Sequence, residues 1–298
     1  MINSSLAPIC LFTYNRLNET TQTVDALKKN FLASESILII YSDGGKDELS
    51  WNKVNSVRSY LRSITGFKSV EIIESDKNKG LANSIISGVT DVIKKYEKVI
   101  VLEDDLLTSQ NFLNYMNQGL DFYEHNNKIF NISGFSFDLK SLADYEKDFY
   151  YGYRASSWGW GTWRNRWETI DWEAQAYKRT LYNPLQHLRF MRGGSDMPLM
   201  LWRQMHGKID SWAIRWCLQQ FIDNKFTVFP SISKVESIGF GADATHTKLH
   251  SNFSTKLDNE KKVKFNFINK INLSNQLMVE FQSRFSVLSR LRRKITNL

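Results

Sequence analysis

The run KVIVLEDDL, residues 98–106, combines a buried-strand pattern with an unusual concentration of charge. Its first half is an unbroken apolar stretch, typical of a core strand. Where that stretch ends, three adjacent carboxylates follow, Glu103, Asp104 and Asp105. Carboxylates this close raise one another's pKa values, so the cluster favours a positive partner. The alternative interpretation is a solvated acidic turn that caps the next helix.

Earlier apolar runs and helical patterns give this strand its context. The apolar runs occupy residues 8–14, 36–43 and 69–76, and the amphipathic patterns occupy residues 18–33, 50–64 and 80–95. This βαβαβαβ order predicts an α/β fold with a mostly parallel sheet flanked by helices. Because ligands bind beyond the carboxyl ends of such strands, we expect Asp43, Asp76 and the acidic run to meet at one rim.

The second half of the chain shows a weaker pattern. A helix is expected after Ser109 as N-cap, a strand at 129–137, an irregular aromatic region at 150–172 and helices near 196–206 and 211–223. Neither an internal repeat nor a linker rich in proline and glycine interrupts the chain. The pattern therefore predicts one domain over residues 1–255 and a basic helical tail over residues 256–298.

Composition limits the class of protein. The chain has 298 residues, 42% hydrophobic and 23% charged, as expected for a globular protein. Its two cysteines, Cys10 and Cys217, form no CxxC pair, which indicates a reducing compartment. The first residues lack a basic region followed by a long apolar stretch, so neither a signal peptide nor a membrane span is expected there. A cytoplasmic location follows as an expectation.

The net charge of +8 is concentrated at the C-terminal end. Residues 281–298, FQSRFSVLSRLRRKITNL, contain five basic residues and no acid. Apolar residues recur there at three- and four-residue spacing, which predicts an amphipathic helix on an anionic membrane surface. That contact would lie at the inner face of the cytoplasmic membrane. A helix packed back on the domain, or a solvated end, is the alternative.

The familiar phosphate-binding motifs are absent from the sequence. The first predicted strand runs into TYNRLNE rather than GxGxxG, and the chain contains no GxxxxGK[ST]. Carboxylates that hold a divalent cation are the usual substitute, and the hard oxygen ligands of the acidic run suit Mn²⁺ or Mg²⁺. These ions normally also bind substrate phosphates. A cation site is thus the interpretation that we favour for this run.

Seven segments taken in order resemble nucleotide-sugar glycosyltransferases of the GT-A fold. They are TYNR (13–16), SDGG (42–45), NKGLANSI (78–85), LEDDL (102–106), SSWGWGTW (156–163), KIDSWAIRW (208–216) and VFPSISKVESIGFGADATH (228–246). The resemblance covers roughly residues 7–246. It is to the family-2-like bacterial group related to N-acetylglucosaminyltransferase I, in which the DxD motif is written EDD. The resemblance implies a GT-A, Rossmann-like sheet with helices on its faces.

The resemblance also implies site residues, position by position. Those that match the donor or nucleotide site are Thr13, Tyr14, Arg16, Asp43, Asn78, Gly80, Ala82, Glu103, Asp104, Trp158, Gly159 and Trp160. Asp105 matches the metal ligand, and His246 lies in a segment similar to one that closes over the metal or diphosphate. Each group keeps a structural alternative: a turn at Asp43, a helix cap at Asn78 and Gly80, and core packing for the tryptophans.

Asp210 is the candidate catalytic base. The segment IDSW, residues 209–212, resembles a WDDW segment of the related group, whose first Asp serves as base. Ile209 and Ser211 depart from that pattern, and Asp196 is the fallback. The structural alternative is that Asp210 caps the helix that follows it.

The expected function is that of a metal-dependent, inverting glycosyltransferase. It would move a sugar from a nucleotide diphosphate, expected to be UDP, to a glycan or lipid-linked glycan acceptor in bacterial surface polysaccharide biosynthesis, such as lipopolysaccharide or capsule. A nucleotidyltransferase is the first alternative, but the segment TYNRLNE lacks the glycine- and lysine-rich loop that it requires. A basic nucleic-acid-binding protein is the second, and it gives no reason for the acidic run. No nucleic-acid partner is expected.

Overall fold

The structure is a computed structural model of the chain and describes residues 5–239 and 255–286. In the amino-terminal half the elements are β1 (Ile9–Thr13), α1 (Leu17–Lys28), η1 (Ala33–Glu35), β2 (Ile37–Ser42), α2 (Glu48–Leu61), β3 (Ser69–Glu74), α3 (Leu81–Tyr96), β4 (Lys98–Glu103), β5 (Leu106–Thr108), α4 (Phe112–Tyr123) and β6 (Ile129–Ser133). The remaining elements are η2 (Lys140–Leu142), β7 (Phe149–Gly152), β8 (Trp160–Trp163), α5 (Arg164–Trp167), α6 (Tyr177–Tyr182), α7 (Pro184–Phe190), η3 (Met191–Gly193), α8 (Met197–Met205), α9 (Trp212–Ile222), β9 (Phe226–Pro230), β10 (Val235–Ser237) and α10 (Asn275–Arg284).

A mixed sheet of eight strands forms the centre of the fold, in the order β3-β2-β1-β4-β8-β6-β9-β7. Neighbours from β3 to β4 pair in parallel, whereas β8 is antiparallel to both of its neighbours and β7 is antiparallel to β9. Six strands therefore run one way and two run the other. This confirms the predicted α/β class, and the order reverses at β1, where the chain goes first to β2 and later to β4.

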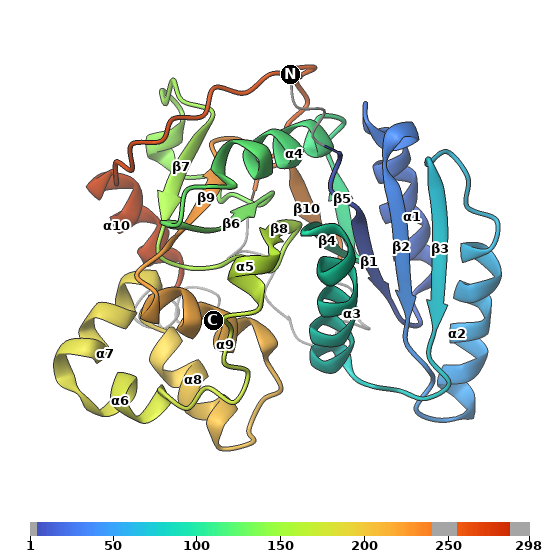
Figure 1. Cartoon of the computed structure of the whole chain (residues 1–298), viewed down its shortest axis with the longest axis horizontal. Coiled ribbons are helices and arrows are strands. Elements are labelled where there is room, and N and C mark those ends of the chain that lie inside the picture. Colours follow the sequence, from blue (N-terminus) through green and yellow to red (C-terminus); the bar gives the residue numbers. More distant parts are fainter. Residues whose placement is uncertain (1–4, 240–254, 287–298) are drawn as a thin grey trace, which may run out of the picture.

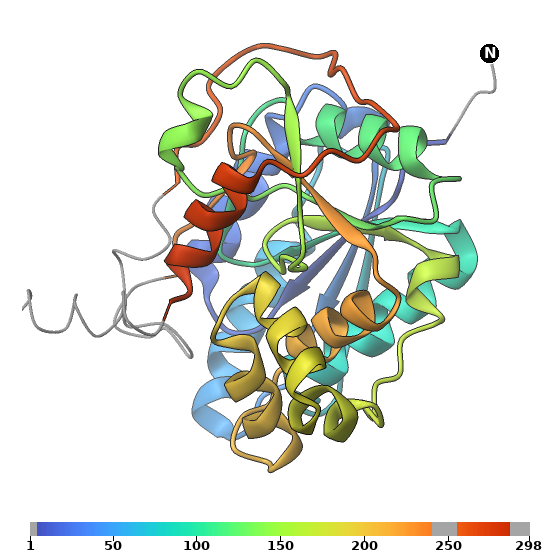
Figure 2. The same cartoon turned by 90° about the vertical axis from the view of Figure 1, so that its left-hand side faces the viewer.

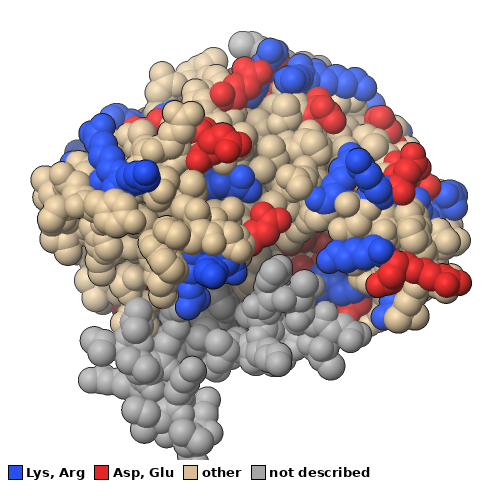
Figure 3. Space-filling view, turned by 90° about the horizontal axis from the view of Figure 1, so that it is seen from below, with Lys and Arg blue, Asp and Glu red and all other residues tan. Residues whose placement is uncertain are grey.

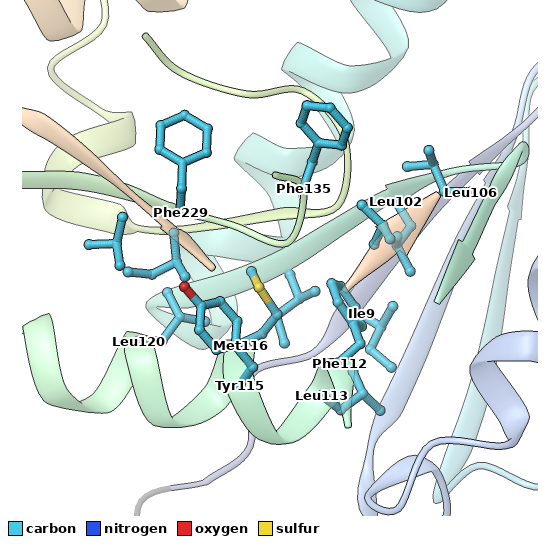
Figure 4. Close-up of a cluster of buried hydrophobic side chains, with 14 of the residues drawn as sticks. Ile9, Leu102, Leu106, Phe112, Leu113, Tyr115, Met116, Leu120, Phe135 and Phe229 are labelled. Carbon is cyan, nitrogen blue, oxygen red and sulfur yellow. The ribbon is translucent and has the colours of Figure 1, made fainter. Parts of the chain in front are cut away.

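Helices cover both faces of the sheet. Successive side chains of β1 point to opposite faces, and all of them are buried, so both faces must be covered. Ile9 and Leu11 belong to a buried cluster that includes residues of α1, α2 and α4, part of which Figure 4 shows. Cys10 and Phe12 point to the other face and belong to a second cluster with α3 and α9. Every residue of β1 is buried, so its unbroken apolar sequence reflects coverage on both sides.

The start of α4 differs from its prediction. Ser109 was expected as the N-cap, but Asn111 occupies that position and its side chain makes no capping hydrogen bond. Instead, Ser109 Oγ donates to Asn111 Oδ1 at 2.7 Å, and Asn111 Nδ2 donates to Asp258 Oδ2 at 2.9 Å. The polar residues at this helix start therefore hold a distant segment of the chain.

That distant segment crosses the domain before it forms a helix. Residues 255–274 form no helix or strand apart from an isolated bridge between Leu257 and Ser233, and Asp258 forms a buried ion pair with Lys234. The helix α10 follows, with Phe281 and Phe285 buried against Phe137. The apolar positions of residues 281–286 thus pack on the domain, while residues 287–298 of the predicted tail lie outside the described residues. None of the helices in the described ranges is both long and apolar enough to cross a bilayer.

The strands and the later helices share one end of the molecule. In Figure 1 the arrowheads of β1, β2 and β3 point toward the end at which α6, α7 and α8 lie. Figure 2 shows the same helices (yellow) below the sheet after the quarter turn. The carboxyl ends of the parallel strands are therefore at the end of the molecule that carries these helices.

Candidate functional site

Arg16 and two carboxylates meet where the order of the strands reverses. Arg16 follows β1 and precedes α1, whereas Asp104 and Asp105 lie between β4 and β5. The Nη2 atom of Arg16 is 2.6 Å from Asp104 Oδ1 and 3.0 Å from Asp105 Oδ2. The acidic run thus has a positive partner within the chain. A point of strand reversal is also where open α/β sheets bind ligands.

Backbone contacts fix the two aspartates in different ways. Asp104 is only 4% exposed; its carboxylate accepts from Tyr14 N at 3.2 Å, and its carbonyl accepts from Thr23 Oγ1 at 3.0 Å. The side chain of Asp105 is more exposed, 19% against 6% for Asp104. A Cβ on Gly239 would lie 2.0 Å from Asp105 Oδ2, so a larger residue there would force this carboxylate to move. Asp105 is therefore the acid of the pair that an incoming ligand reaches more easily.

The acidic run carries a high electrostatic cost. Burial, followed by the charges of Asp105 and Asp104, raises the pKa of Glu103 to about 8. Burial also raises the pKa of Asp104 to about 6, although Arg16 opposes that rise. Burial alone would lower the pKa of Arg16, but the two aspartates raise it. A further cation would lower the carboxyl pKa values and stabilise the charged forms.

Asp43 organises a second part of the rim, between β2 and α3. Its Oδ1 accepts from Gly44 N at 2.9 Å and Lys79 N at 2.8 Å, and its Oδ2 accepts from Gly80 N at 3.0 Å and Asn78 Nδ2 at 3.2 Å. Gly80 has a φ of 77° and occupies the N-cap position of α3 without a side-chain cap bond. The turn and cap roles that the sequence left open are thus combined in one network around a single carboxylate.

A shallow depression of the surface lies beside this network. Its lining comes from the carboxyl ends of β2 and β3 and from the first turns of α3: Tyr41, Ser42, Asp43, Ile73, Glu74, Ser75, Lys79, Ser84 and Ser87. Two further predicted residues nearby are buried. Ala82 is 1% exposed, and Thr13 Oγ1 has no hydrogen-bond partner among the described residues. Thr13 O instead accepts from Asp43 N at 3.0 Å, which links the two parts of the rim.

Arg58 is a residue of this rim that sequence reasoning missed. It lies on α2 and is 6% exposed. Its guanidinium donates to Ser42 O at 3.2 Å and Ser75 O at 2.7 Å, and it lies 3.4 Å from Glu74. It therefore holds the carboxyl ends of β2 and β3 together. The available signal was an arginine on the apolar stripe of a predicted helix.

The predicted donor-site residues Trp158, Gly159 and Trp160 have different surroundings. Trp160 is fully buried on β8, with its ring centroid 4.3 Å from that of Trp216, so its side chain has the core role that the sequence offered as the alternative. Trp158 is only partly buried and packs edge-on against Phe135 at 4.7 Å. Gly159 has a φ of 56°, and a Cβ there would lie 2.7 Å from Val235. Of the two indole side chains, only that of Trp158 remains partly accessible.

The two candidate bases are in contrasting environments. The side chain of Asp210 is 66% exposed, and its Oδ1 lies 4.0 Å from Arg215. Ser211, not Asp210, is the N-cap of α9, and its side chain accepts from Ile214 N at 3.4 Å. Asp196 is 6% exposed and receives two hydrogen bonds from Arg154, at 2.8 and 3.1 Å. The cap role considered for Asp210 is therefore wrong, because the next residue performs it.

The rim offers two protein ligands to a divalent cation rather than a complete cage. Within residues 5–239 and 255–286 no group of three or more His, Cys, Asp or Glu side chains could hold a metal ion. His246 lies outside the described residues. Mg²⁺ and similar hard cations commonly bind one or two carboxylates together with substrate phosphates. The carboxylates of Asp104 and Asp105 would suit that mode, in which a phosphate-bearing ligand and water would complete the set of ligands.

Comparison with known proteins gives only distant similarity. No protein-family model matches the sequence, and a search of curated proteins finds no match. The chain is similar to the solved structure of a mannosyltransferase from Pyrobaculum calidifontis in complex with GDP-Man and Mn2+, with 10% identity, a TM-score of 0.39 and coverage of 74% of this chain and 73% of that chain. It is also similar to galactosyltransferase LgtC in complex with donor and acceptor sugar analogs, with 11% identity, a TM-score of 0.37 and coverage of 72% and 70%. Similarity at this level does not establish a shared activity or ligand.

Proposed function

We propose that the chain is a glycosyltransferase that uses a nucleotide diphosphate sugar as donor. The observation that carries this proposal is the meeting of Arg16 with Asp104 and Asp105 where the strand order reverses at β1. That arrangement combines a ligand-binding position of the fold with charge suited to a cation and a diphosphate. The resemblance of the sequence to GT-A glycosyltransferases supports the same function and makes UDP the expected nucleotide.

In this proposal, different residues of the rim bind different parts of the donor. The network of Asp43 with Asn78 and Gly80 shapes the depression that would take the base and ribose. Asp105, with Asp104 behind it, would hold Mn²⁺ or Mg²⁺. A bound divalent cation stabilises the negative charge that develops on a leaving diphosphate. Glu103 and the partly accessible Trp158 would also contact the donor.

Asp210 is the proposed base of an inverting transfer. Its exposed carboxylate can accept the proton of an acceptor hydroxyl, which then attacks the anomeric carbon from the face opposite the diphosphate. Asp196 is less suited, because Arg154 occupies both of its carboxylate oxygens. The proposed acceptor is a glycan, free or lipid-linked, of a bacterial surface polysaccharide, made at the cytoplasmic face of the membrane.

Donor binding and its dependence on metal provide the direct test. Calorimetry with UDP, GDP and their sugars, with and without Mn²⁺, should show nucleotide binding that requires the metal, and slow hydrolysis of the preferred sugar should follow the same requirement. Asp105→Asn should remove the metal-dependent part of the affinity while the melting temperature stays close to that of the unmodified protein. Asp25→Asn, on the exposed side of α1, is the matched control. Unchanged Mn²⁺–UDP affinity in Asp105→Asn would exclude the proposed metal site.

A further inference from the structure

The helices α6, α7 and α8, here called the helical lobe, present an unusual set of exposed apolar side chains. They are Tyr182, Leu185, Leu188, Leu199 and Trp202, with exposed fractions of 65, 63, 64, 49 and 39%. Single exposed leucines are normal on a protein surface, but a concentration of large ones on three adjoining helices is a feature of interaction surfaces.

Helical spacing separates the exposed side chains from those that pack inward. Leu185 and Leu188 lie three residues apart on α7, while Phe190 on the same helix is 1% exposed. Leu199 and Trp202 have the same spacing on α8, while Leu201 is fully buried. Each helix therefore already has a buried face. Trp202 stacks on His206 with ring centroids 4.3 Å apart, and the exposed leucines of both helices form the rest of the apolar surface.

The charge of the lobe is almost entirely positive. Between residues 177 and 208 the basic residues are Lys178, Arg179, Arg189, Arg192, Arg203 and Lys208, and all of them are exposed. The only acid in this stretch is Asp196, which is buried and paired with Arg154. Figure 3, which views this end of the molecule, shows a broad area without charge that is bordered by Lys and Arg groups and also by some Asp and Glu groups. Within residues 177–208 the surface thus combines exposed apolar side chains with exposed basic ones.

We propose that the helical lobe docks on an anionic lipid bilayer. Leucine, tryptophan and tyrosine insert favourably at the boundary between head groups and acyl chains, and the surrounding Lys and Arg side chains are attracted to anionic head groups. A second copy of this chain is a poorer partner, because an isologous contact would place like charges opposite one another. The inference depends on neither the proposed activity nor the predicted C-terminal tail.

Docking through the lobe would have a geometric consequence. The lobe lies at the end of the molecule toward which the carboxyl ends of β1, β2 and β3 point (Figure 1). A bilayer in contact with the lobe would therefore lie at the same end as the rim that carries Asp43 and Asp104. A ligand embedded in that bilayer would be held on the side of the molecule that contains the site.

Vesicle binding by the full chain tests the proposal. Co-sedimentation should be measured with vesicles of phosphatidylcholine alone and of phosphatidylcholine with 30% phosphatidylglycerol (about 3:7 anionic to neutral) at two salt concentrations. We expect binding to the anionic vesicles that weakens with salt. The double variant Leu185→Glu/Leu188→Glu should reduce the partition coefficient by about tenfold or more, because it removes apolar contact and adds negative charge. Leu49→Glu, at an exposed leucine on α2, should bind like the unmodified chain.

The tail provides the competing explanation and is changed separately in the full chain. The triple variant Arg290→Glu/Arg292→Glu/Arg293→Glu reverses charge in residues 281–298 and leaves the lobe intact. If this variant alone loses binding and the lobe variant binds normally, the proposal is overturned. It is also overturned if the unmodified chain binds neither type of vesicle, an outcome that would favour an acidic protein as the partner. Circular dichroism and melting temperature must show that the lobe variant is folded.

Discussion

The guanidinium of Arg16 lies against the carboxylate of Asp104, with Nη2 2.6 Å from Oδ1, and so links the end of β1 to the end of β4. The same nitrogen reaches Asp105, which makes Arg16 the internal counter-charge of the acidic run. A divalent cation bound to the two aspartates would compete with Arg16 for the same oxygens. Loss of Arg16 should therefore lower the stability of the metal-free protein. It should also increase the stabilisation that metal binding provides.

Arg16→Ala is the first prediction that follows. The ion pair is mostly buried and its loss leaves the aspartates without their donor, so the free energy of unfolding should fall by about 1–3 kcal/mol in the presence of a chelator. Addition of Mn²⁺ should then raise the melting temperature of the variant more than that of the unmodified chain, because the metal replaces the missing charge. Thermal unfolding with and without Mn²⁺ measures both effects.

A surface pair serves as the control for Arg16. Arg62 lies 2.7 Å from Glu74, but the Arg62 side chain is 59% exposed. Arg62→Ala should therefore cost only about 0–1 kcal/mol and should leave the response to Mn²⁺ unchanged. An equal response to Mn²⁺ in Arg16→Ala and the unmodified chain would show that the arginine and the metal do not share a site.

Asp43→Ala is the second prediction. The change leaves three backbone amides without their side-chain acceptor and removes one of the two acceptors of the Asn78 side chain, at a cost of about 2–3 kcal/mol in the free energy of unfolding. Because the loop before α3 then loses its anchor, nucleotide affinity should fall as well. Calorimetric titration with UDP and thermal unfolding check the two effects. Asp76→Ala, an exposed acid at the end of the neighbouring strand, should change neither; nucleotide binding that survives in Asp43→Ala would rule out a role for this loop.

Much of the parallel half of the fold could be predicted, because buried parallel strands and their helices leave strong periodic patterns. The predicted strands at 8–14, 36–43, 69–76 and 98–105 contain β1, β2, β3 and β4. The strand order and the antiparallel insertion of β8 could not be predicted, because they depend on pairing between distant segments. Residue chemistry predicted a positive partner for the acidic run, and the structure places Arg16 there; the divalent cation expected at the same run stays a prediction.

Several features of the site could not be predicted, because they depend on contacts between residues that are far apart in the sequence. Arg58 interacts with two strand ends that are distant from it in sequence, and Asp258 replaces a local cap partner for Asn111. Trp160 and Trp158 are two residues apart, yet one is fully buried and the other partly accessible. Such differences in burial are set by the packing of the whole domain, so they could not be predicted from residue type and spacing.

The third prediction concerns pH and Glu103. Burial and the neighbouring aspartates raise its pKa from 4.5 to about 8, so the folded chain holds a proton that the unfolded chain releases over that interval. Glu103 therefore reduces stability progressively as the pH rises from about 4.5 to about 8. Glu103→Gln should remove this loss. The free energy of unfolding of the variant should therefore exceed that of the unmodified chain by a margin that grows over this pH interval to about 1 kcal/mol or more.

Urea unfolding at a series of pH values, with metal chelated, measures this difference. Glu35→Gln, at an exposed glutamate outside the rim, is the control for a change of charge alone. A constant difference between Glu103→Gln and the unmodified chain from pH 5 to pH 8 would contradict the prediction.

The fourth prediction separates catalysis from helix capping at two adjacent residues. Asp210 is exposed and Ser211 caps α9, so the two possible roles belong to different side chains. Asp210→Asn removes a base and leaves the cap in place; transfer to the acceptor should fall by about 10²–10⁴-fold in kcat, with an unchanged melting temperature. Ser211→Ala removes the cap and leaves the base; it should lower the free energy of unfolding by about 1 kcal/mol and keep most of the activity. Steady-state transfer rates and thermal unfolding of the two variants measure both properties. Near-normal kcat in Asp210→Asn would exclude it as the base, and a large loss in Asp196→Asn with a preserved melting temperature would transfer that role to Asp196.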